Sequence, residues 1–474
     1  MDLNSPLPHP DVAQLEQFSQ QVLAWLLEHF RTLAEQSIGA TASRSEMEAL
    51  LREPPPEAGQ DFAAVLAEFS AKVAPHAFRV NHPRFLAFVP SAPSFLSVLG
   101  DMLCAGTNFF AGVWLEAAGP AQVEIVVLDW LKSFLGYPAT AQGVLTSGGS
   151  EANLTALVVA RAGLDFADRG RAVLYVTEQR HKSIDRAAMV IGLHPDQIRP
   201  VRTDEHFRLD PAALAQEIQR DRAAGRLPWA LAANAGATNT GVVDPLPTLA
   251  DLCAAEKLWF HVDAAYGWPA VLTPGGRRDL AGIDRADSVT LDPHKWFAQT
   301  FEAGCLLVRD GPQLPRTFAY LADYLQDVAA GTDEINFCDH GIALTRRFRA
   351  LKIWLSVKVL GVAWHRELAE RCCRLADHAY ELLQRAGRFE ILSPPRLSIV
   401  CFRYRPVRAQ VSVNRFNEAL VGALRATGRA FLSSTLLRNQ FALRFCFVNW
   451  RTTAGDVAEV VNLLAKLGRE LEEA

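Results

Sequence analysis

Residues 143–154 read GVLTSGGSEANL, and they join a short apolar run, a glycine pair and the start of an amphipathic helical pattern. Gly148 and Gly149 let the backbone approach an anion, and Ser150 offers a hydroxyl beside the free N–H groups of a helix N-terminus. No lysine follows the glycine pair, so the segment is not a P-loop. Taken alone, it fits a phosphate site and an ordinary tight turn between a strand and a helix equally well.

The alternation of short apolar runs with longer amphipathic ones extends from about residue 81 to 360. This alternation predicts an α/β fold, in which helices cover both faces of a mostly parallel sheet. The expected strands are Gly143–Thr146, Ala172–Val176, Ala230–Ala233, Trp259–Val262, Ser288–Leu291 and Cys305–Val308, and helical patterns such as Glu151–Ala162 and Leu246–Glu256 lie between them.

The two ends of the chain carry other patterns. Residues 1–80 predict a helical arm, because apolar residues recur at helical spacing from Val12 to Phe30 and again in Phe62–Val73. Residues 361–474 predict a small α+β domain, with helices expected at 363–386, 413–427 and 454–471 and strands at 389–392, 398–402, 430–434 and 441–447. We therefore expect three parts, with residues 81–360 forming the large α/β domain.

Composition excludes several classes of protein. Half of the 474 residues are apolar and 21% are charged, which excludes intrinsic disorder. The net charge of −4 gives no reason to expect a nucleic-acid or anionic-membrane partner. The longest uncharged stretches, residues 85–100 and 102–115, are shorter than the roughly 18 apolar residues that a membrane span needs.

The cysteines and the N-terminus indicate the compartment. The eight cysteines show neither a CxxC motif nor a paired spacing with histidine, so we expect no disulfide framework and no metal site. The opening MDLNSPLPHP lacks the positive charge and apolar run of a secretory signal. We expect a cytoplasmic protein with reduced thiols.

Two further segments each end an apolar run with a charged residue. Residues 258–266, LWFHVDAAY, deliver Asp263, and residues 288–296, SVTLDPHKW, deliver Lys295. Ligands of open α/β sheets collect at the carboxyl ends of the strands. A phosphate cradle, a carboxylate and a lysine at one such edge are what pyridoxal 5′-phosphate requires: the helix N-terminus binds the phosphate, the carboxylate keeps the ring nitrogen protonated, and the lysine bonds to the aldehyde.

The chain resembles the group II pyridoxal-phosphate-dependent amino-acid decarboxylases, and within them the aromatic-L-amino-acid decarboxylases. The motifs that carry this resemblance extend from about residue 75 to 450: NHPRF (81–85), DMLC (101–104), SGGSEAN (147–153), HKS (181–183), HVDAAY (261–266), DPHKW (292–296) and RRFRALK (346–352). The resemblance implies the fold of type I pyridoxal-phosphate enzymes, like aspartate aminotransferase, and a homodimer whose active sites lie at the interface.

The resemblance also implies roles for individual residues. His181 is expected to stack on the cofactor ring and to assist proton transfer. The cofactor is expected to contact Gly148, Gly149, Ser150, Thr238, Asp263, Ala265, Asp292, His294 and Lys295. Relatives more often carry Asn at the position of Asp292, and a carboxylate beside a phosphate is unfavourable unless it is paired.

Tyr324 aligns, counting from Lys295 without gaps, with the catalytic tyrosine of the family's mobile loop, and Tyr320 is the competing candidate. With Lys295, His181 and Asp263, Tyr324 completes the expected catalytic set. The following residues 326–334 are rich in Ala, Gly and acidic residues, which is typical of a flexible lid.

The substrate class follows from the charges near the expected substrate contacts. Residues 85–116 contain no Lys, Arg or His that could offset an acidic side chain, whereas Phe and Trp are frequent. The residues expected to contact the substrate are Phe88, Val89, Pro90, Ser91, Phe110 and Arg444, although Arg444 could equally form a domain-interface ion pair. An aromatic amino acid such as Tyr, Trp, Phe or a hydroxylated relative is the expected substrate, and the corresponding amine and CO₂ are the expected products.

Three alternatives stay open at this point. The first is an aldehyde synthase, which decarboxylates and then oxidatively deaminates; Tyr324 and His181 argue against it, because family members with that activity tend to change one of these residues. The second is an aminotransferase-like enzyme or a decarboxylase of a non-aromatic amino acid on the same fold. The third is a non-catalytic dimeric scaffold, which the intact pair of Lys295 and Asp263 disfavours.

Overall fold

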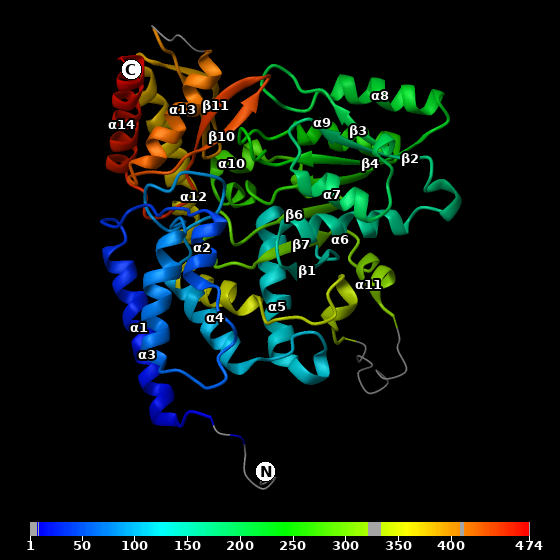
Figure 1. The fold of residues 1–474 in the computed structure, drawn as a ribbon. Helices are drawn as coiled ribbons and strands as arrows, with labels where there is room; N and C mark the ends of the chain where they lie inside the picture. The colour runs from blue at the N-terminus through cyan, green and yellow to red at the C-terminus, as the bar shows by residue number, and fades with distance from the viewer. Residues whose placement is uncertain (1–6, 8, 321–332, 408–411, 474) are drawn as a thin grey trace.

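Seven strands form the central sheet of the computed structural model, which describes residues 7, 9–320, 333–407 and 412–473 (Figure 1). They are β1 (Gln142–Thr146), β2 (Ala172–Thr177), β3 (Ile198–Val201), β4 (Leu227–Asn234), β5 (Trp259–Asp263), β6 (Ser288–Leu291) and β7 (Gly304–Val308). Their order in the sheet is β1-β7-β6-β5-β4-β2-β3. Strands β2 to β6 pair in parallel, and β7 runs antiparallel to both β6 and β1. The predicted α/β fold with a mostly parallel sheet is confirmed.

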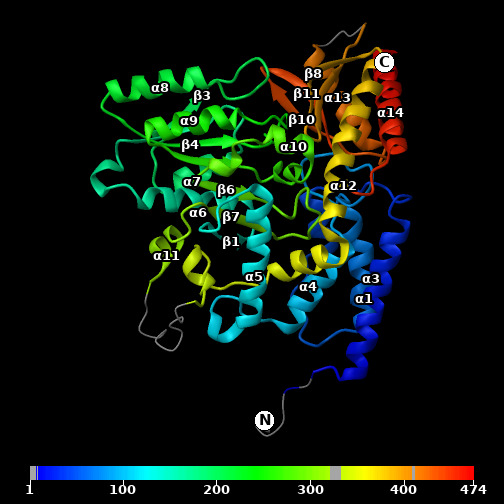
Figure 2. The ribbon, with the colours of Figure 1, turned by 180° about the vertical axis from the view of Figure 1, so that it is seen from behind.

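Successive residues of β2 point to opposite faces of the sheet, and helices cover both faces. Leu174 and Val176 pack with α6 (Gly149–Ala162) and α7 (Lys182–Val190). Val173 and Tyr175 belong to the larger core that contains α8 (Pro211–Ala223) and α9 (Leu246–Glu256). Figures 1 and 2 show these two helix pairs on opposite sides of the strands. Because both faces are buried, the strand sequences are continuously apolar rather than alternating.

A second sheet lies in the C-terminal part of the chain and is entirely antiparallel. Its order is β10-β11-β9-β8, formed by β8 (Phe389–Arg396), β9 (Ile399–Tyr404), β10 (Ser433–Leu437) and β11 (Gln440–Cys446). The helices α13 (Val413–Ala426) and α14 (Ala454–Glu473) belong to the same unit. The elements agree with the expected α+β pattern, except that the strand predicted at 430–434 begins three residues later.

One long helix connects the two sheets. Helix α12 covers Ala350–Arg385 and bends at Gly361, whose φ of 77° lies in the left-handed region that favours glycine. A helix was predicted only from residue 363, so the first 13 residues of α12, more than three turns, were missed. The division of the chain at 80 and 360 stays a prediction.

The remaining helices pack around the large sheet or form the N-terminal arm. They are α1 (Val12–Thr32), α2 (Arg44–Leu51), α3 (Phe62–Glu68), α4 (Phe95–Thr107), α5 (Trp114–Leu135), α10 (Pro274–Asp279) and α11 (Gln313–Phe318). Helix α1 lies along α3, and the Phe18 and Phe62 rings stack with centroids 4.4 Å apart (Figure 2). None of the residues of α1 is buried. No described helix is both long enough and apolar enough to cross a membrane.

Candidate active site

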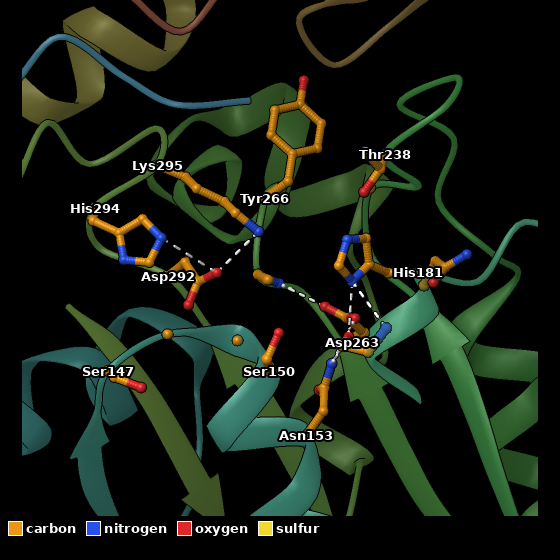
Figure 3. Close-up of a pocket in the computed structure, with 16 residues that line it drawn as sticks. Ser147, Ser150, Asn153, His181, Thr238, Asp263, Tyr266, Asp292, His294 and Lys295 are labelled. Carbon is orange, nitrogen blue, oxygen red and sulfur yellow. Dashed lines mark hydrogen bonds and ion pairs between the residues drawn. The ribbon is translucent and has the colours of Figure 1, made fainter. Parts of the chain in front are cut away.

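A cavity of about 380 Å³ opens where several strands of the large sheet end (Figure 3). It is lined by Ser147, Gly148, Gly149, Ser150, Asn153, His181, Ser183, Asn234, Gly236, Thr238, Asp263, Ala265, Tyr266, Asp292, His294 and Lys295. Strands β1, β2, β4, β5 and β6 each deliver residues of this set at or just beyond their carboxyl ends. The three segments that the sequence analysis brought together therefore meet at one edge of the sheet.

The floor of the cavity is the N-terminus of α6. Gly148 precedes the helix without a side-chain cap, so the first N–H groups of α6 have no capping side chain at that position. A Cβ atom on Gly149 would lie 2.8 Å from Asp292 Oδ2 and 3.2 Å from the Ala265 Cβ. Only glycine fits there, and it leaves the helix N-terminus open to an anion.

Asp263 occupies the last position of β5 and is held from two sides. Its Oδ1 accepts a hydrogen bond from the Ala265 backbone N–H at 3.1 Å, and its Oδ2 accepts one from Asn153 Nδ2 at 3.0 Å. The carboxylate is thereby fixed in direction while it faces the cavity.

Lys295 pairs with Asp292, and the two groups share the side of the cavity opposite His181 (Figure 3). The distance from Lys295 Nζ to Asp292 Oδ2 is 2.9 Å, and His294 Nε2 lies 3.8 Å from the same oxygen. Burial by itself lowers the pKa of Lys295, but the carboxylates of Asp292 and Asp263 outweigh it and raise the pKa above its usual value. Asp292 Oδ1 is buried and has no hydrogen-bond partner among the described residues.

His181 is the N-cap residue of α7, and this position places its ring near Asp263 at the carboxyl end of β5. Its Nδ1 lies 2.8 Å from Ser183 Oγ. Burial lowers the pKa of His181, and although Asp263 opposes this effect, the net direction is downward. Figure 3 shows the ring between Thr238 and Asp263 in this view.

All of the predicted cofactor contacts lie on this cavity, but the predicted substrate contacts do not. Phe88, Val89, Pro90, Ser91, Phe110 and Arg444 are absent from the described lining of the cavity. Ser91 is buried and donates to the Val448 carbonyl at 2.5 Å. Their role toward a substrate stays a prediction.

Arg444 has hydrogen-bond partners within this chain. It is buried, and its guanidinium donates to the Thr238 carbonyl and to Ser433 Oγ. Through these hydrogen bonds, Arg444 of the C-terminal sheet connects that sheet to the loop that contains Thr238. Tyr324 lies outside the described residues, and Tyr320, its competitor, is exposed.

Sequence reasoning missed Asn153, Ser183, Asn234 and Tyr266, which also line the cavity. Asn153 lies in the SGGSEAN motif, four residues after Gly149 and so on the same side of α6. That spacing was the available signal for Asn153. Ser183 follows His181 by two residues in the same motif.

Comparison with known proteins gives a consistent result. The model of the pyridoxal-dependent decarboxylase conserved domain matches residues 45–405. An aromatic-L-amino-acid decarboxylase from Bacillus atrophaeus is 40% identical over 97% of this chain and 96% of its own length. A phenylacetaldehyde synthase from Arabidopsis thaliana is 29% identical over 92% of this chain and 91% of its own. Among solved structures, Oryza sativa TDC with PLP and tryptamine superposes with a TM-score of 0.92, at 28% identity, covering 98% of this chain and 99% of that one.

Proposed function

Because the chain belongs to the pyridoxal-dependent decarboxylase family, we propose that it decarboxylates an aromatic L-amino acid to the corresponding amine, with pyridoxal 5′-phosphate as its cofactor. The observation that carries this proposal is the convergence of Lys295, Asp263 and the α6 N-terminus on one cavity. The aromatic substrate is supported by the similarity to the Bacillus atrophaeus aromatic-L-amino-acid decarboxylase.

The residues present fit this cofactor. The α6 N-terminus and Ser150 are suited to the phosphate, and a Cβ at Gly149 would fill the cradle. Asp263 is suited to the ring nitrogen, and Lys295 to the aldehyde. When bound, the cofactor supplies an electron-withdrawing ring that accepts the electron pair left behind by departing CO₂.

The protein's own groups perform the other tasks. Asp263, oriented by the Ala265 N–H and by Asn153, holds a proton on the ring nitrogen. Lys295 would hold the cofactor through its ε-amino group. His181 would lie against the cofactor ring, and Tyr324 is proposed to return a proton to the α-carbon.

Replacing Lys295 by Ala tests the assignment of the site. We expect Lys295→Ala to lose turnover by at least about 10³-fold, because no other lysine lines the described cavity. It should also lose the covalent attachment of the cofactor that borohydride reduction and peptide mass spectrometry detect. Normal turnover, or attachment at another lysine, contradicts the assignment.

A panel of amino acids, with amine, aldehyde and keto acid read by mass spectrometry, tests the reaction. We expect amine from Tyr, Trp, Phe or a hydroxylated relative, and none from acidic amino acids. The second candidate function, an aldehyde synthase, is favoured by the similarity to the Arabidopsis thaliana phenylacetaldehyde synthase. Release of peroxide and ammonia in amounts equal to CO₂ would establish that alternative.

We further propose that the protein is a homodimer in the cytoplasm. Support for the dimer comes from exposed apolar side chains on α1 and α4, among them Val12, Val22, Leu23, Leu27, Met102 and Leu103. Support for the compartment comes from the cysteines: all eight lie in the described part of the chain and carry free thiols.

A further inference from the structure

A chain of hydrogen bonds runs through the sheet beneath the cavity. Trp259 Nε1 donates to Ser288 Oγ at 2.9 Å, and Ser288 Oγ lies 2.9 Å from His261 Nδ1. His261 Nε2 lies 3.0 Å from Asn153 Oδ1. The chain thus passes from β5 and β6 into α6, where Asn153 is only 1% exposed.

At Trp259 the chain begins with an indole N–H, which only donates, so Ser288 Oγ accepts from it; a hydroxyl has a second lone pair, so this bond alone does not set the next one. Burial lowers the pKa of His261 to about 4, which leaves the ring neutral. Asn153 Oδ1 only accepts, so the proton of His261 sits on Nε2 and is donated to it, and Nδ1 accepts from Ser288 Oγ.

The orientation of the Asn153 amide is fixed at Asp263. An ionised carboxylate only accepts, so the group of Asn153 that faces Asp263 Oδ2 at 3.0 Å must be its NH₂. The second hydrogen of this NH₂ goes to Ser183 Oγ at 2.8 Å. The Asn153 amide then makes three hydrogen bonds in this network. Its Oδ1 accepts from His261 Nε2, and its two N–H groups donate to Asp263 Oδ2 and Ser183 Oγ on the cavity side.

The direction continues to His181. Because Ser183 Oγ accepts from Asn153, its hydrogen is free for His181 Nδ1 at 2.8 Å. The Ser183 backbone N–H also donates to this nitrogen, at 3.3 Å. With Nδ1 accepting twice, the proton of the neutral ring is on Nε2, which Figure 3 shows on the side of the ring away from Asp263.

We propose that Asn153 is a positioning residue that joins Asp263 and His181 in one directed hydrogen-bond chain and holds the proton of His181 on Nε2, facing the cavity. The hydrogen-bond chain itself does not depend on the proposed function; only the role of His181 toward a bound molecule does. In that role, His181 Nε2–H offers a hydrogen bond to the bound substrate or cofactor, and Nδ1 cannot accept a proton from it.

The tautomer of His181 can be measured directly. Magic-angle-spinning NMR of the holoenzyme, with ¹⁵N in the histidine rings and His181 assigned by its loss in His181→Gln, distinguishes a protonated from an unprotonated ring nitrogen. We expect protonated Nε2 and unprotonated Nδ1 in the wild-type protein. A proton on Nδ1 overturns the proposal, and this outcome needs neither a variant nor a substrate.

Asn153→Asp tests whether Asn153 sets the direction. The new carboxyl group lies about 3 Å from that of Asp263, so the two groups share one proton between them. No N–H of residue 153 then faces Ser183, so Ser183 Oγ should donate to the new carboxyl oxygen and accept from His181 Nδ1. This moves the proton of His181 from Nε2 to Nδ1, at the cost of the 3.3 Å bond from the Ser183 backbone N–H. We expect this reversal together with a loss in kcat of about tenfold or more, whereas KM changes less than threefold. An unchanged tautomer in Asn153→Asp overturns the proposal.

Asn417→Asp is the matched control for loss of stability. Asn417 is also fully buried and makes three hydrogen bonds to backbone groups, but it lies in α13 of the C-terminal unit. We expect its His181 signals and its kcat to match the wild type. If Asn153→Asp does not fold, Ser183→Ala replaces it: it removes the hydroxyl donor, and an undiminished preference for Nε2 would show that Asn153 does not act through Ser183. Failure of the proposed function appears separately, as a panel without aromatic amine beside an unchanged NMR result.

Discussion

At the scale of single residues, Asp292 is the carboxylate that pairs with Lys295 in the cavity. A carboxylate at this position faces the α6 N-terminus and pairs with Lys295, so it is neither solvated nor alone. The groups around it are Lys295 and His294 from its own segment, with His181, Asp263 and Cys305 from α7, β5 and β7. The main effect of Asp292 is thus to favour the protonated, charged form of Lys295.

Asp292→Asn should change the pH at which Lys295 reacts. The two nearby carboxylates raise the pKa of Lys295, so at neutral pH its side chain is held as an unreactive ammonium. Removing one of them lowers that pKa, and the free amine then forms at lower pH. We expect the midpoint of the rate of covalent cofactor capture to move to lower pH, as measured by stopped-flow absorbance over a range that extends above the ordinary lysine pKa of about 10.4.

Asp251→Asn provides the control for this experiment, because Asp251 is an exposed partner of Arg285 away from the cavity. Its midpoint should equal that of the wild type. An Asp292→Asn profile that coincides with the wild-type profile would show that Asp292 does not control Lys295.

Local motifs made much of the candidate site predictable. Lys295, Asp263 and Gly149 each end or follow an apolar run, and strand ends of a parallel sheet meet at one edge. Asn153 and its partners were not predictable, because a hydrogen bond between α6 and β5 depends on how the two elements pack. Arg444 could be assigned to the site region, but only the packing of β11 shows that it binds the Thr238 carbonyl.

At the scale of elements, a buried ion pair joins the segment that precedes α12 to α5, and both of its residues bond to the backbone of β1. Arg346 and Glu124 are 2% and 0% exposed at their side chains, with Nη2 and Oε1 2.6 Å apart. Arg346 also donates to the Leu145 carbonyl, and Glu124 accepts from the Leu145 N–H. These hydrogen bonds fix the position of β1, whose carboxyl end leads into the α6 N-terminus at the floor of the cavity.

Arg346→Met should therefore destabilise the protein strongly. The substitution leaves Glu124 as an uncompensated buried charge, which typically costs about 3–5 kcal/mol in the free energy of unfolding. Urea denaturation followed by circular dichroism measures this loss. Adding Glu124→Leu to the variant should recover part of it.

Arg374→Met is the matched control. Arg374 pairs with Glu367 at 2.6 Å, but both side chains are about 60% exposed. The expected change is below about 1 kcal/mol, because exposed ion pairs contribute little. Equal losses of unfolding free energy in Arg346→Met and Arg374→Met would contradict the expectation that the buried ion pair matters more for stability than the exposed one.

The elements themselves were predictable where their sequence is strongly patterned. All six strands expected in the large sheet are present, whereas β3 was missed because it has only four residues and contains Arg199 and Pro200. The start of β10 was displaced because residues 430–432 are apolar and buried without belonging to the strand. Within this run, Phe431 forms an isolated bridge with Phe85 instead of pairing in the C-terminal sheet.

At the scale of the whole molecule, the N-terminal arm leaves apolar surface exposed. Helix α1 contacts α3, yet Leu23 and Leu27 remain 37% and 45% exposed. Other apolar side chains of α1, such as Val22, are also exposed. The apolar stripe was predictable from sequence, but whether it is covered within one chain was not. The homodimer stays a prediction that this surface supports.

Leu23→Glu combined with Leu27→Glu should weaken the proposed dimer. Two carboxylates on the apolar stripe would have to lose their hydration at the interface, which is costly. We expect monomers at micromolar concentration by analytical ultracentrifugation, whereas the wild type sediments as a dimer. Leu436→Glu, at an exposed position of β10, should leave the dimer intact; a wild-type monomer would refute the proposal itself.

The pairing of β1 with β7 has a consequence for biosynthesis. Residues 142–146 emerge from the ribosome some 160 residues before their partners at 304–308, and Thr146 pairs with Gly304 directly beside the turn that starts α6. A nascent chain that ends before β7 therefore has the glycine turn without the strand that supports it. Contacts of such long sequence separation form late in folding. The cofactor-binding edge is thus completed only after residue 308 has been synthesised.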